Sequence, residues 1–250
     1  MATQLKIATL NCAGMVNDAR RTILYDVCKK LNVDIILLQE THSCPVDEPK
    51  WHDERAPLES AFKSAKDNSH RRNGVAILVN KPQLTLKNSK YDEKGRILAV
   101  TIFQDTTPIA NLVNVYPPTT SYSSQVRNDI FNSLYNYLDW TEPNIIAGNF
   151  NMVTNPALHR QPSTTTKECP QNFKELCETF NFKDSYRLLY NNLKIFTRRQ
   201  GHRQSRLDRF YVDQLITSKQ EWSFPIAISD HDAVILQLET IKLHKSGKGI

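Results

Sequence analysis

Short stretches rich in apolar and β-branched residues recur along the chain and predict eight β-strands. They lie at residues 5–10, 34–39, 74–80, 97–103, 109–115, 144–147, 207–212 and 233–238. Several of them are apolar at almost every position, which is typical of strands that are buried on both faces of a sheet. We therefore expect sheets that are covered on both sides.

Between these strands, apolar residues three or four positions apart predict three helices, near residues 23–31, 126–138 and 173–180. One β-α-β unit opens the chain, three strands follow without a helix, and a helix then leads into the next strand. This order excludes a purely parallel doubly wound sheet and predicts an α/β fold with two packed sheets and helices outside. Because no repeat or linker interrupts the pattern, we expect one domain over residues 1–240. A polar tail, or the start of a linker to a following domain, is expected over residues 241–250.

The charge of the chain is concentrated in one segment. Lys and Arg number 32 and Asp and Glu 26, which gives a net charge of +6. Residues 183–209 contain eight basic residues and two acidic ones, and therefore account for the whole surplus. A concentrated basic patch indicates a polyanionic partner, nucleic acid before membrane, although a solvated basic loop has the same composition.

Glycine and cysteine usage exclude several classes of site. The seven glycines are spaced so that neither GxGxxG nor GxxxxGK can be written, which excludes the common nucleotide-binding loops. The five cysteines form no CxxC pair, which argues against a disulfide framework or a structural zinc site. The apolar runs are too short to span a bilayer, and the first residues lack the apolar core of a signal peptide.

Polar side chains interrupt or follow six of the predicted strands. They are Asn11, Glu40, Tyr116, the Gly-Asn-Phe-Asn segment at 148–151, Asp208, and the Ser-Asp-His-Asp segment at 229–232. Each one alone is compatible with a turn or a helix cap. Because ligand-binding and catalytic groups of α/β proteins gather at strand ends, the six together could build one cleft.

These residue types suit phosphoryl chemistry. Glu40, with amide or carboxylate neighbours and water, offers the oxygen ligands that Mg²⁺ prefers. A metal ion and a histidine can together hold a phosphoryl group whose charge grows in the transition state. His231, between Asp230 and Asp232, is the strongest histidine candidate. A buried aspartate behind it would fix its tautomer and raise its pKa.

Five motifs occur in an order that resembles the endonuclease/exonuclease/phosphatase superfamily. They are TLNCAG (9–14), LQETH (38–42), GNFN (148–151), SRLDR (205–209) and SDH (229–231). The resemblance covers residues 4–240. It is closest to the apurinic-type endonuclease domain of LINE (non-LTR) retrotransposons, on NPALHR (155–160), DSYR (184–187), IFT (195–197) and FYV (210–212).

The resemblance implies a four-layer α/β-sandwich and Mg²⁺-dependent hydrolysis of one DNA phosphodiester, with Mn²⁺ as a possible substitute for Mg²⁺. The nick would leave a 3′-hydroxyl that primes reverse transcription. The natural full-length chain would carry a reverse transcriptase domain and act in the nucleus. We expect the isolated domain to be a monomer that binds duplex DNA and no membrane.

The resemblance also implies roles for individual residues. Glu40 and Asn11 would hold the metal, and Asp230 would sit behind it. His231, oriented by Asp208, would contact the scissile phosphate. Asn151 would orient the attacking water or the phosphate, and Tyr116 would support the same cluster. Thr197 would lie on a loop that enters the DNA groove. The remaining candidate DNA contacts are Arg198, Arg199, Arg203, Arg206, Ser229 and, on the approach at 69–74, Arg71 and Arg72.

One residue departs from the family pattern. The family has Gly-Asp-Phe-Asn where this chain has Asn149 after Gly148. The missing aspartate is the expected partner of the attacking water, and an amide cannot accept a proton at neutral pH. Since loss of a general base typically costs about 10²–10⁴ in rate, we expect a chain that binds DNA and cleaves it poorly.

The origin of Asn149 and the exact activity stay open. A single exchange among otherwise complete motifs favours a substitution made to trap a DNA complex over the decay of a retroelement. An active variant with another base is a third possibility. Alternative functions are a non-catalytic DNA-binding module, a repair endonuclease for abasic sites, and a phosphodiesterase or phosphatase of the same superfamily. The basic segment argues against the last. The target-site sequence is not readable from the chain, because it depends on loop conformation and DNA deformability.

Overall fold

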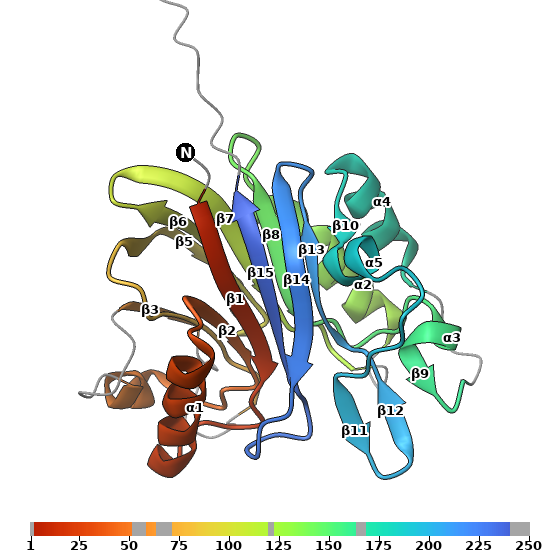
Figure 1. Cartoon of the computed structure of the whole chain (residues 1–250), viewed down its shortest axis with the longest axis horizontal. Coiled ribbons are helices and arrows are strands. Elements are labelled where there is room, and N and C mark those ends of the chain that lie inside the picture. The colour runs from red at the N-terminus through yellow and green to blue at the C-terminus, as the bar shows by residue number, and fades with distance from the viewer. Residues whose placement is uncertain (1–2, 52–58, 64–71, 120–122, 164–168, 241–250) are drawn as a thin grey trace, which may run out of the picture.

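Two six-stranded sheets form the centre of the molecule (Figure 1). A computed structural model describes residues 3–51, 59–63, 72–119, 123–163 and 169–240. The first sheet has the order β14 (Ile216–Phe224), β15 (Ala233–Thr240), β1 (Thr3–Asn11), β2 (Ile35–Gln39), β4 (Val75–Val79) and β3 (Glu59–Lys63). The second has the order β10 (Lys183–Asp184), β13 (Asp208–Val212), β8 (Asn144–Asn149), β7 (Thr107–Val115), β6 (Ile97–Gln104) and β5 (Leu84–Tyr91).

Each sheet is mixed, with one parallel pair at its centre. β1 pairs in parallel with β2, and β7 with β8, while the other described neighbours in the two large sheets are antiparallel. Parallel neighbours need a crossover connection. Helix α1 (Asp18–Leu31) supplies it in the first sheet and α2 (Ser124–Ser133) in the second. The C-terminal ends of the two parallel strands therefore lie at the same edge in each sheet.

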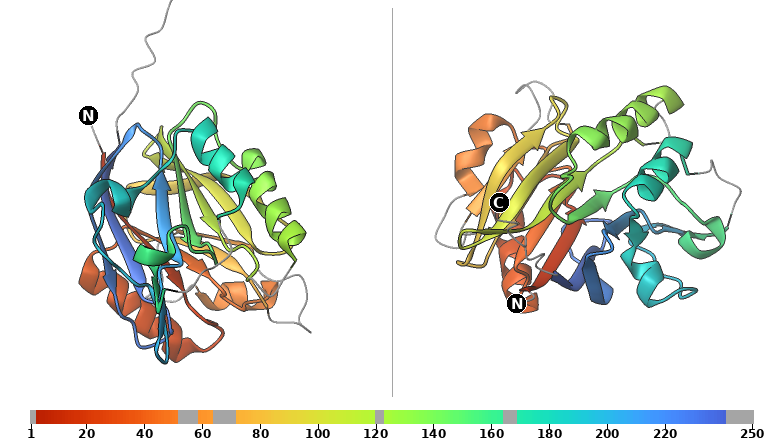
Figure 2. Two further views of the ribbon diagram at one scale, coloured as in Figure 1. Left: turned by 90° about the vertical axis from the view of Figure 1, so that its right-hand side faces the viewer. Right: turned by 90° about the horizontal axis from the view of Figure 1, so that it is seen from above.

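Alternate side chains of the strands enter different layers. Ile35 and Leu37 of β2 face the second sheet in the central core, whereas Ile36 and Leu38 face α1. On the other side, α2, the 3₁₀ turn η2 (Leu134–Asn136) and α4 (Gln171–Thr179) cover the second sheet. Figure 2 shows the two sheets face to face with these helices outside. The expected α/β sandwich is therefore confirmed.

The three predicted helices are present, and their ends have local causes. In α1 the Asn17 side chain accepts a hydrogen bond from the Ala19 amide (2.8 Å), which caps the first turn, and Asn32 ends the helix in the left-handed conformation. Further short elements are η1 (Pro45–Trp51), α3 (Pro156–His159) and α5 (Ser185–Leu189). A small third sheet projects from the lower edge in Figure 1, in the order β11 (Arg198–Gln200), β12 (Arg203–Ser205) and β9 (Arg160–Gln161).

Buried amides join the two large sheets close to the edge where the parallel strands end. Gln39 at the end of β2 donates from Nε2 to Asn114 Oδ1 of β7 (2.8 Å), and Asn114 Nδ2 donates to the Leu38 carbonyl (2.9 Å). A buried hydrogen-bonded pair of this kind specifies one register of the two layers, because any other register would leave the amides unpaired. The ends of β2 and β7 are thereby held together.

Within the described ranges, no helix is long and apolar enough to cross a membrane. The expected tail at residues 241–250 and the candidate contact Arg71 lie outside the described residues. The assignment of residues 1–240 to one domain remains a prediction.

Candidate active site

Six backbone segments bring polar side chains to one edge of the sandwich. β1, β2, β7 and β8 run toward this edge and end at or next to Asn11, Glu40, Tyr116 and Asn149. β13 begins there with Asp208, because it pairs antiparallel with β8. β15 is antiparallel to β1, so the residues just before it, including His231, also lie at this edge. The predicted convergence of the strand-end residues is what the topology produces.

Glu40 is the centre of one cluster. Its Oε1 accepts hydrogen bonds from Asn11 Nδ2 (2.9 Å) and from the Tyr116 hydroxyl. Its Oε2 lies 3.7 Å from His42 Nε2, and the Glu40 side chain is 26% exposed. Burial, followed by the negative charge of Glu40, raises the pKa of Tyr116, which keeps this hydroxyl a donor. Glu40 has a backbone φ of 54°, in the left-handed region that non-glycine residues seldom adopt.

This cluster fits a hydrated Mg²⁺ ion better than a transition metal. The Glu40 carboxylate is partly open to solvent. Asn11 contacts it through Nδ2, and the amide oxygen of Asn11 accepts a hydrogen bond from the Ala13 amide at 3.2 Å. No group of three or more histidine, cysteine or acidic side chains that could hold a metal is found in the described ranges. Mg²⁺ binds through one or two carboxylates and retains several waters, so a single carboxylate with an amide neighbour suffices.

His231 and Asp208 form the second cluster. His231 Nδ1 lies 2.8 Å from Asp208 Oδ2, and both side chains are almost fully buried. Burial acts to lower the pKa of His231, but the charge of Asp208 and the hydrogen bond to it outweigh burial and raise the pKa. This bond leaves Nε2 as the ring nitrogen that is not engaged by Asp208, as the expected orienting role of Asp208 requires.

Asn149, the last residue of β8, and Asn151, just after the strand, connect the two clusters. Asn149 is directly opposite Asp208 in the β8–β13 pair, is 1% exposed, and accepts a hydrogen bond from the Asn151 amide (2.9 Å). Asn151 donates to the Pro117 carbonyl (2.8 Å), just after Tyr116, and its φ is 49°. Gly148 lets β8 lie close to the end of β7, because a Cβ at this position would be 2.0 Å from the Val115 carbonyl oxygen.

The loop that carries His231 is tied to the loop that carries Asn11. Ser229 donates from Oγ to the Asn11 carbonyl (2.6 Å) and accepts from the His231 amide (3.0 Å). The Ser229 hydroxyl therefore links the backbone at Asn11 to the backbone at His231. Asp230 does not join the Glu40 cluster as expected; its carboxylate pairs with Arg198 at 3.0 Å.

Two of the predicted DNA contacts are wrong. Arg206 is 1% exposed and makes a bidentate ion pair with Asp184 (2.6 and 2.7 Å), so it has no free face for a phosphate. Thr197 is fully buried, donates to Asp208 Oδ2 (2.6 Å) and accepts from the amides of Leu207 and Asp208. It lies at the root of the β11–β12 hairpin and fixes the carboxylate behind His231.

The other predicted basic contacts lie at the surface. Arg198 and Arg199 are partly exposed and pair with Asp230 and Asp232 respectively. Arg203 and Arg72 are exposed. Sequence reasoning did not include Arg160, which faces the same hairpin, or Arg20, which binds the carbonyls of both active-site loops. Arg160 is the last residue of the NPALHR motif, and Arg20 lies six residues after the TLNCAG motif, but neither position by itself indicates a function.

Comparisons with known proteins identify the family of this chain. Residues 8–231 match the model of the Endonuclease/Exonuclease/phosphatase family. The chain is 30% identical over 249 residues to the transposon TX1 uncharacterized 149 kDa protein of Xenopus laevis, covering 94% of this chain and 18% of that protein. The chain thus spans about a fifth of the length of this relative.

Solved structures share the fold at low sequence identity. An AP endonuclease from Archaeoglobus fulgidus superposes with a TM-score of 0.72 at 19% identity, over 93% of this chain and 98% of that one. AP endonuclease LMAP from Leishmania major gives 0.73 at 18%, over 95% and 88%. The catalytic domain of APE2 from Xenopus laevis gives 0.68 at 18%, over 96% and 94%. Because the family model matches most of its length, the chain belongs to the endonuclease/exonuclease/phosphatase family.

Proposed function

We propose that the chain is the Mg²⁺-dependent DNA endonuclease domain of a LINE-type retrotransposon, and that it nicks one strand of duplex DNA to leave a 3′-hydroxyl. One observation carries the proposal: the Glu40 cluster and the His231–Asp208 pair meet at one edge of the sandwich, with Asn149 opposite Asp208. A carboxylate for a metal and an oriented histidine are the two groups needed to hold a phosphodiester for hydrolysis.

Glu40 and Asn11 would hold the metal, and Mn²⁺ would fit the same oxygen ligands. When bound, the metal supplies positive charge that stabilises the developing negative charge on the phosphate. His231, whose raised pKa favours its cationic form, would contact a phosphate oxygen through Nε2. Asn151 would orient the water or the phosphate, and Tyr116 keeps Glu40 in place by its hydrogen bond.

Asn149 would leave this catalyst incomplete. Its carbonyl oxygen is used by the Asn151 amide, and an amide has no basic site for the proton of the attacking water. We expect the chain to bind duplex DNA at this edge and to hydrolyse it slowly. The same observation supports the second candidate, a DNA-binding module without catalytic activity.

The biological setting is proposed from the transposon TX1 relative, whose length exceeds that of this chain about fivefold. The full-length protein would carry a reverse transcriptase that extends the 3′-hydroxyl, and would act in the nucleus. The endonuclease part alone would be a monomer.

The proposal is tested by measuring the rate at which the parent chain and the Asn149→Asp variant nick supercoiled plasmid in Mg²⁺. We expect Asn149→Asp to nick about 10²-fold faster or more. Glu40→Ala in the Asn149→Asp background is the matched control and should remove the gain. Equal, robust nicking with and without the exchange would overturn the assigned role of Asn149. No nicking by Asn149→Asp, together with retained DNA binding, would favour the binding module.

A further inference from the structure

The small third sheet has one strongly basic face. In the antiparallel register, Arg198 lies opposite Ser205, Ser205 lies opposite Arg160, and Gln200 lies opposite Arg203. Cross-strand partners and residues two apart point to the same face of a sheet. The side chains of these five residues therefore share one face, whereas Arg199, Gln204 and Gln161 belong to the other.

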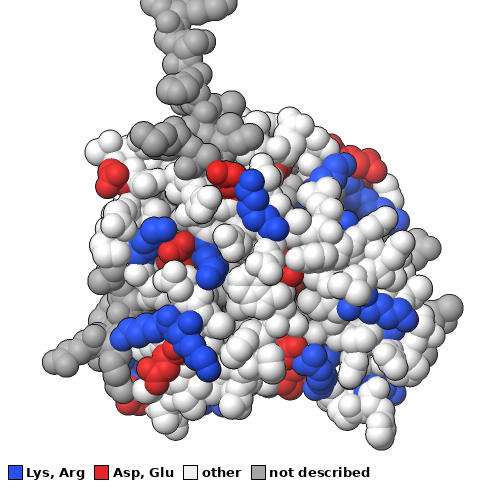
Figure 3. All heavy atoms as spheres, viewed as in Figure 1, with Lys and Arg blue, Asp and Glu red and all other residues white. Residues whose placement is uncertain are grey.

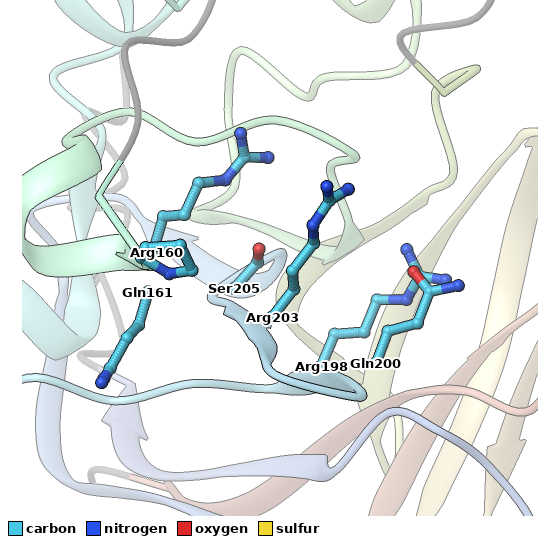
Figure 4. A pocket seen from close by; sticks show the side chains of 7 residues that line it. Arg160, Gln161, Arg198, Gln200, Arg203 and Ser205 are labelled. Carbon is cyan, nitrogen blue, oxygen red and sulfur yellow. The ribbon is translucent and has the colours of Figure 1, made fainter.

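A pocket of about 360 Å³ lies on this basic face, and its lining contains no acidic residue. In Figure 4, Arg160 and Arg203 extend to the same side, with the Ser205 hydroxyl between their stems. Arg198 is engaged with Asp230 at 3.0 Å. Within the described residues, neither Arg160 nor Arg203 forms an ion pair with an acidic side chain.

The pocket is joined to the active site through a single row of paired residues. Arg198 forms an isolated β-bridge with His231, so His231, Arg198, Ser205 and Arg160 are successive neighbours across four backbone segments. Three inter-strand spacings place Arg160 roughly 14 Å from His231 along this row. The pocket is thus on the same edge as His231 but removed from the atom that His231 would contact.

We propose that Arg160, Arg203 and Ser205 form a second phosphate-binding site. It would bind the two non-bridging oxygens of a DNA phosphate other than the one that is cleaved. Two guanidinium groups supply paired donors with the planar geometry that phosphate oxygens accept, and the hydroxyl supplies a further donor. The site would fix the register of the duplex while His231 holds the phosphate to be cleaved. This inference rests on the proposed function, since it assigns the substrate of the basic face to the same DNA.

The salt dependence of binding measures how many phosphates the site holds. Fluorescence anisotropy with a labelled 20-base-pair duplex, in EDTA and at several salt concentrations, gives the slope of log K against log salt. Each neutralised phosphate contributes about 0.9 to that slope. If Arg160 and Arg203 hold one phosphate, then Arg160→Gln, Arg203→Gln and the double variant should each lose at most about 0.9. A loss near 1.8 in the double variant would mean two separate phosphates and would overturn the single-site assignment.

A matched control separates this site from general surface charge. Lys29→Gln removes an exposed cation from the last turn of α1 and should leave the slope unchanged. Arg160→Lys/Arg203→Lys keeps the charge and should restore most of the slope. Equal slopes for the parent and the double Gln variant, with both still folded by circular dichroism, would refute the site. Absence of duplex binding by the parent itself would refute the proposed function instead.

Neutral phosphates locate the contact on the DNA. A methylphosphonate placed at each position in turn should weaken binding of the parent several-fold at one position away from the scissile one, and should have no further effect in the double Gln variant. Inorganic phosphate, titrated against the free protein by calorimetry, tests the other source of the same chemistry. Tight binding of inorganic phosphate, without any methylphosphonate-sensitive position, would show a site for a free anion and would overturn the DNA assignment.

Discussion

Arg206 is a buried cation that faces two carboxylates. Asp184 takes both of its hydrogen bonds, and Glu221 Oε1 lies 3.6 Å away while its other oxygen accepts from Ser185. Burial acts to raise the pKa of Asp184, but Arg206 outweighs it and lowers the pKa. Burial dominates at Glu221 and raises its pKa to about 7. One arginine therefore holds Asp184 ionised, and Glu221 takes up a proton near neutrality.

Glu221→Gln and Asp184→Asn should consequently differ in their effect on stability. Asp184→Asn breaks a buried ion pair and is expected to cost about 3 kcal/mol or more. Glu221→Gln should cost far less at and below pH 7. Because the folded pKa of Glu221 lies above the ordinary value of 4.5, its contribution to stability is present at low pH and is lost as the pH rises through about 7. Urea unfolding from pH 4.5 to 8 should show this loss in the parent and not in Glu221→Gln.

The raised pKa of His231 predicts a pH dependence of DNA binding. Protonated His231 favours a phosphate, so affinity for duplex DNA should fall as the pH rises through the raised pKa. Asp208→Asn removes the negative charge that raises the pKa of His231, and should therefore move the loss of DNA affinity to lower pH. Anisotropy titrations in EDTA measure both curves, and His231→Gln corrects for other histidines. A fall that is unchanged in His231→Gln would contradict the assignment.

At the scale of elements, Arg20 of α1 clamps two loops that are far apart in sequence. Its Nε donates to the Gly14 carbonyl (2.7 Å), and its Nη2 donates to the carbonyls of Cys12 (2.8 Å) and Ile228 (2.5 Å). The first two follow Asn11, and Ile228 precedes the segment that carries His231. The helix that connects β1 to β2 thereby also sets the distance between the Glu40 cluster and His231.

Arg20→Lys in the Asn149→Asp background should separate positioning from charge. Lysine keeps the cation but cannot donate to several carbonyls in one plane. Since a displacement of about 1 Å can cost up to about 10²-fold, we expect a 10- to 10²-fold lower nicking rate with KM almost unchanged. Lys29→Gln on the same helix is the control. An unchanged rate in Arg20→Lys would show that the loops hold their positions without the clamp.

Elements were predictable where burial imposes a pattern. The eight apolar stretches correspond to β1, β2, β4, β6, β7, β8, β13 and β15, and three periodic segments to α1, α2 with η2, and α4. β5 and β14 were not predicted, because their polar residues face solvent at sheet edges. The strands β9, β11 and β12 are two or three residues long and are held by hydrogen bonds between distant segments. They are too short to show a periodic pattern in the sequence.

For the whole molecule, charge in the sequence is a poor guide to charge at the surface. Arg206 and Arg209, both in the basic segment at 183–209, are at most 1% exposed, and Arg198 and Arg199 are neutralised by neighbouring aspartates. On the face in Figure 3, basic and acidic side chains lie side by side. The predicted basic patch is therefore reduced to fewer exposed residues. One of them, Arg203, shares a face of the third sheet with Arg160, which lies outside the basic segment of the sequence.

Metal binding should be visible as a gain in stability of the whole molecule. Mg²⁺ at about ten times its Kd stabilises the folded state by roughly 1.4 kcal/mol, or about 3 °C in Tm for a domain of this size. Thermal unfolding with Mg²⁺ and with EDTA should show this difference in the parent and lose it in Glu40→Gln. Asp26→Asn, an exposed acid on α1, is the control. The same gain in Glu40→Gln would place the metal elsewhere.

The amino-acid sequence was sufficient for the fold class, the strand-end positions of Asn11, Glu40, Tyr116 and His231, and the departure at Asn149, because burial periodicity and ordered motifs are local properties of the chain. Tertiary structure alone decided which polar residues are accessible. Thr197 and Arg206 became buried supports, whereas Arg160 came to the basic face beside Arg203. The physical reason is that exposure and pairing depend on what packs against a side chain, and those partners lie tens to hundreds of residues away.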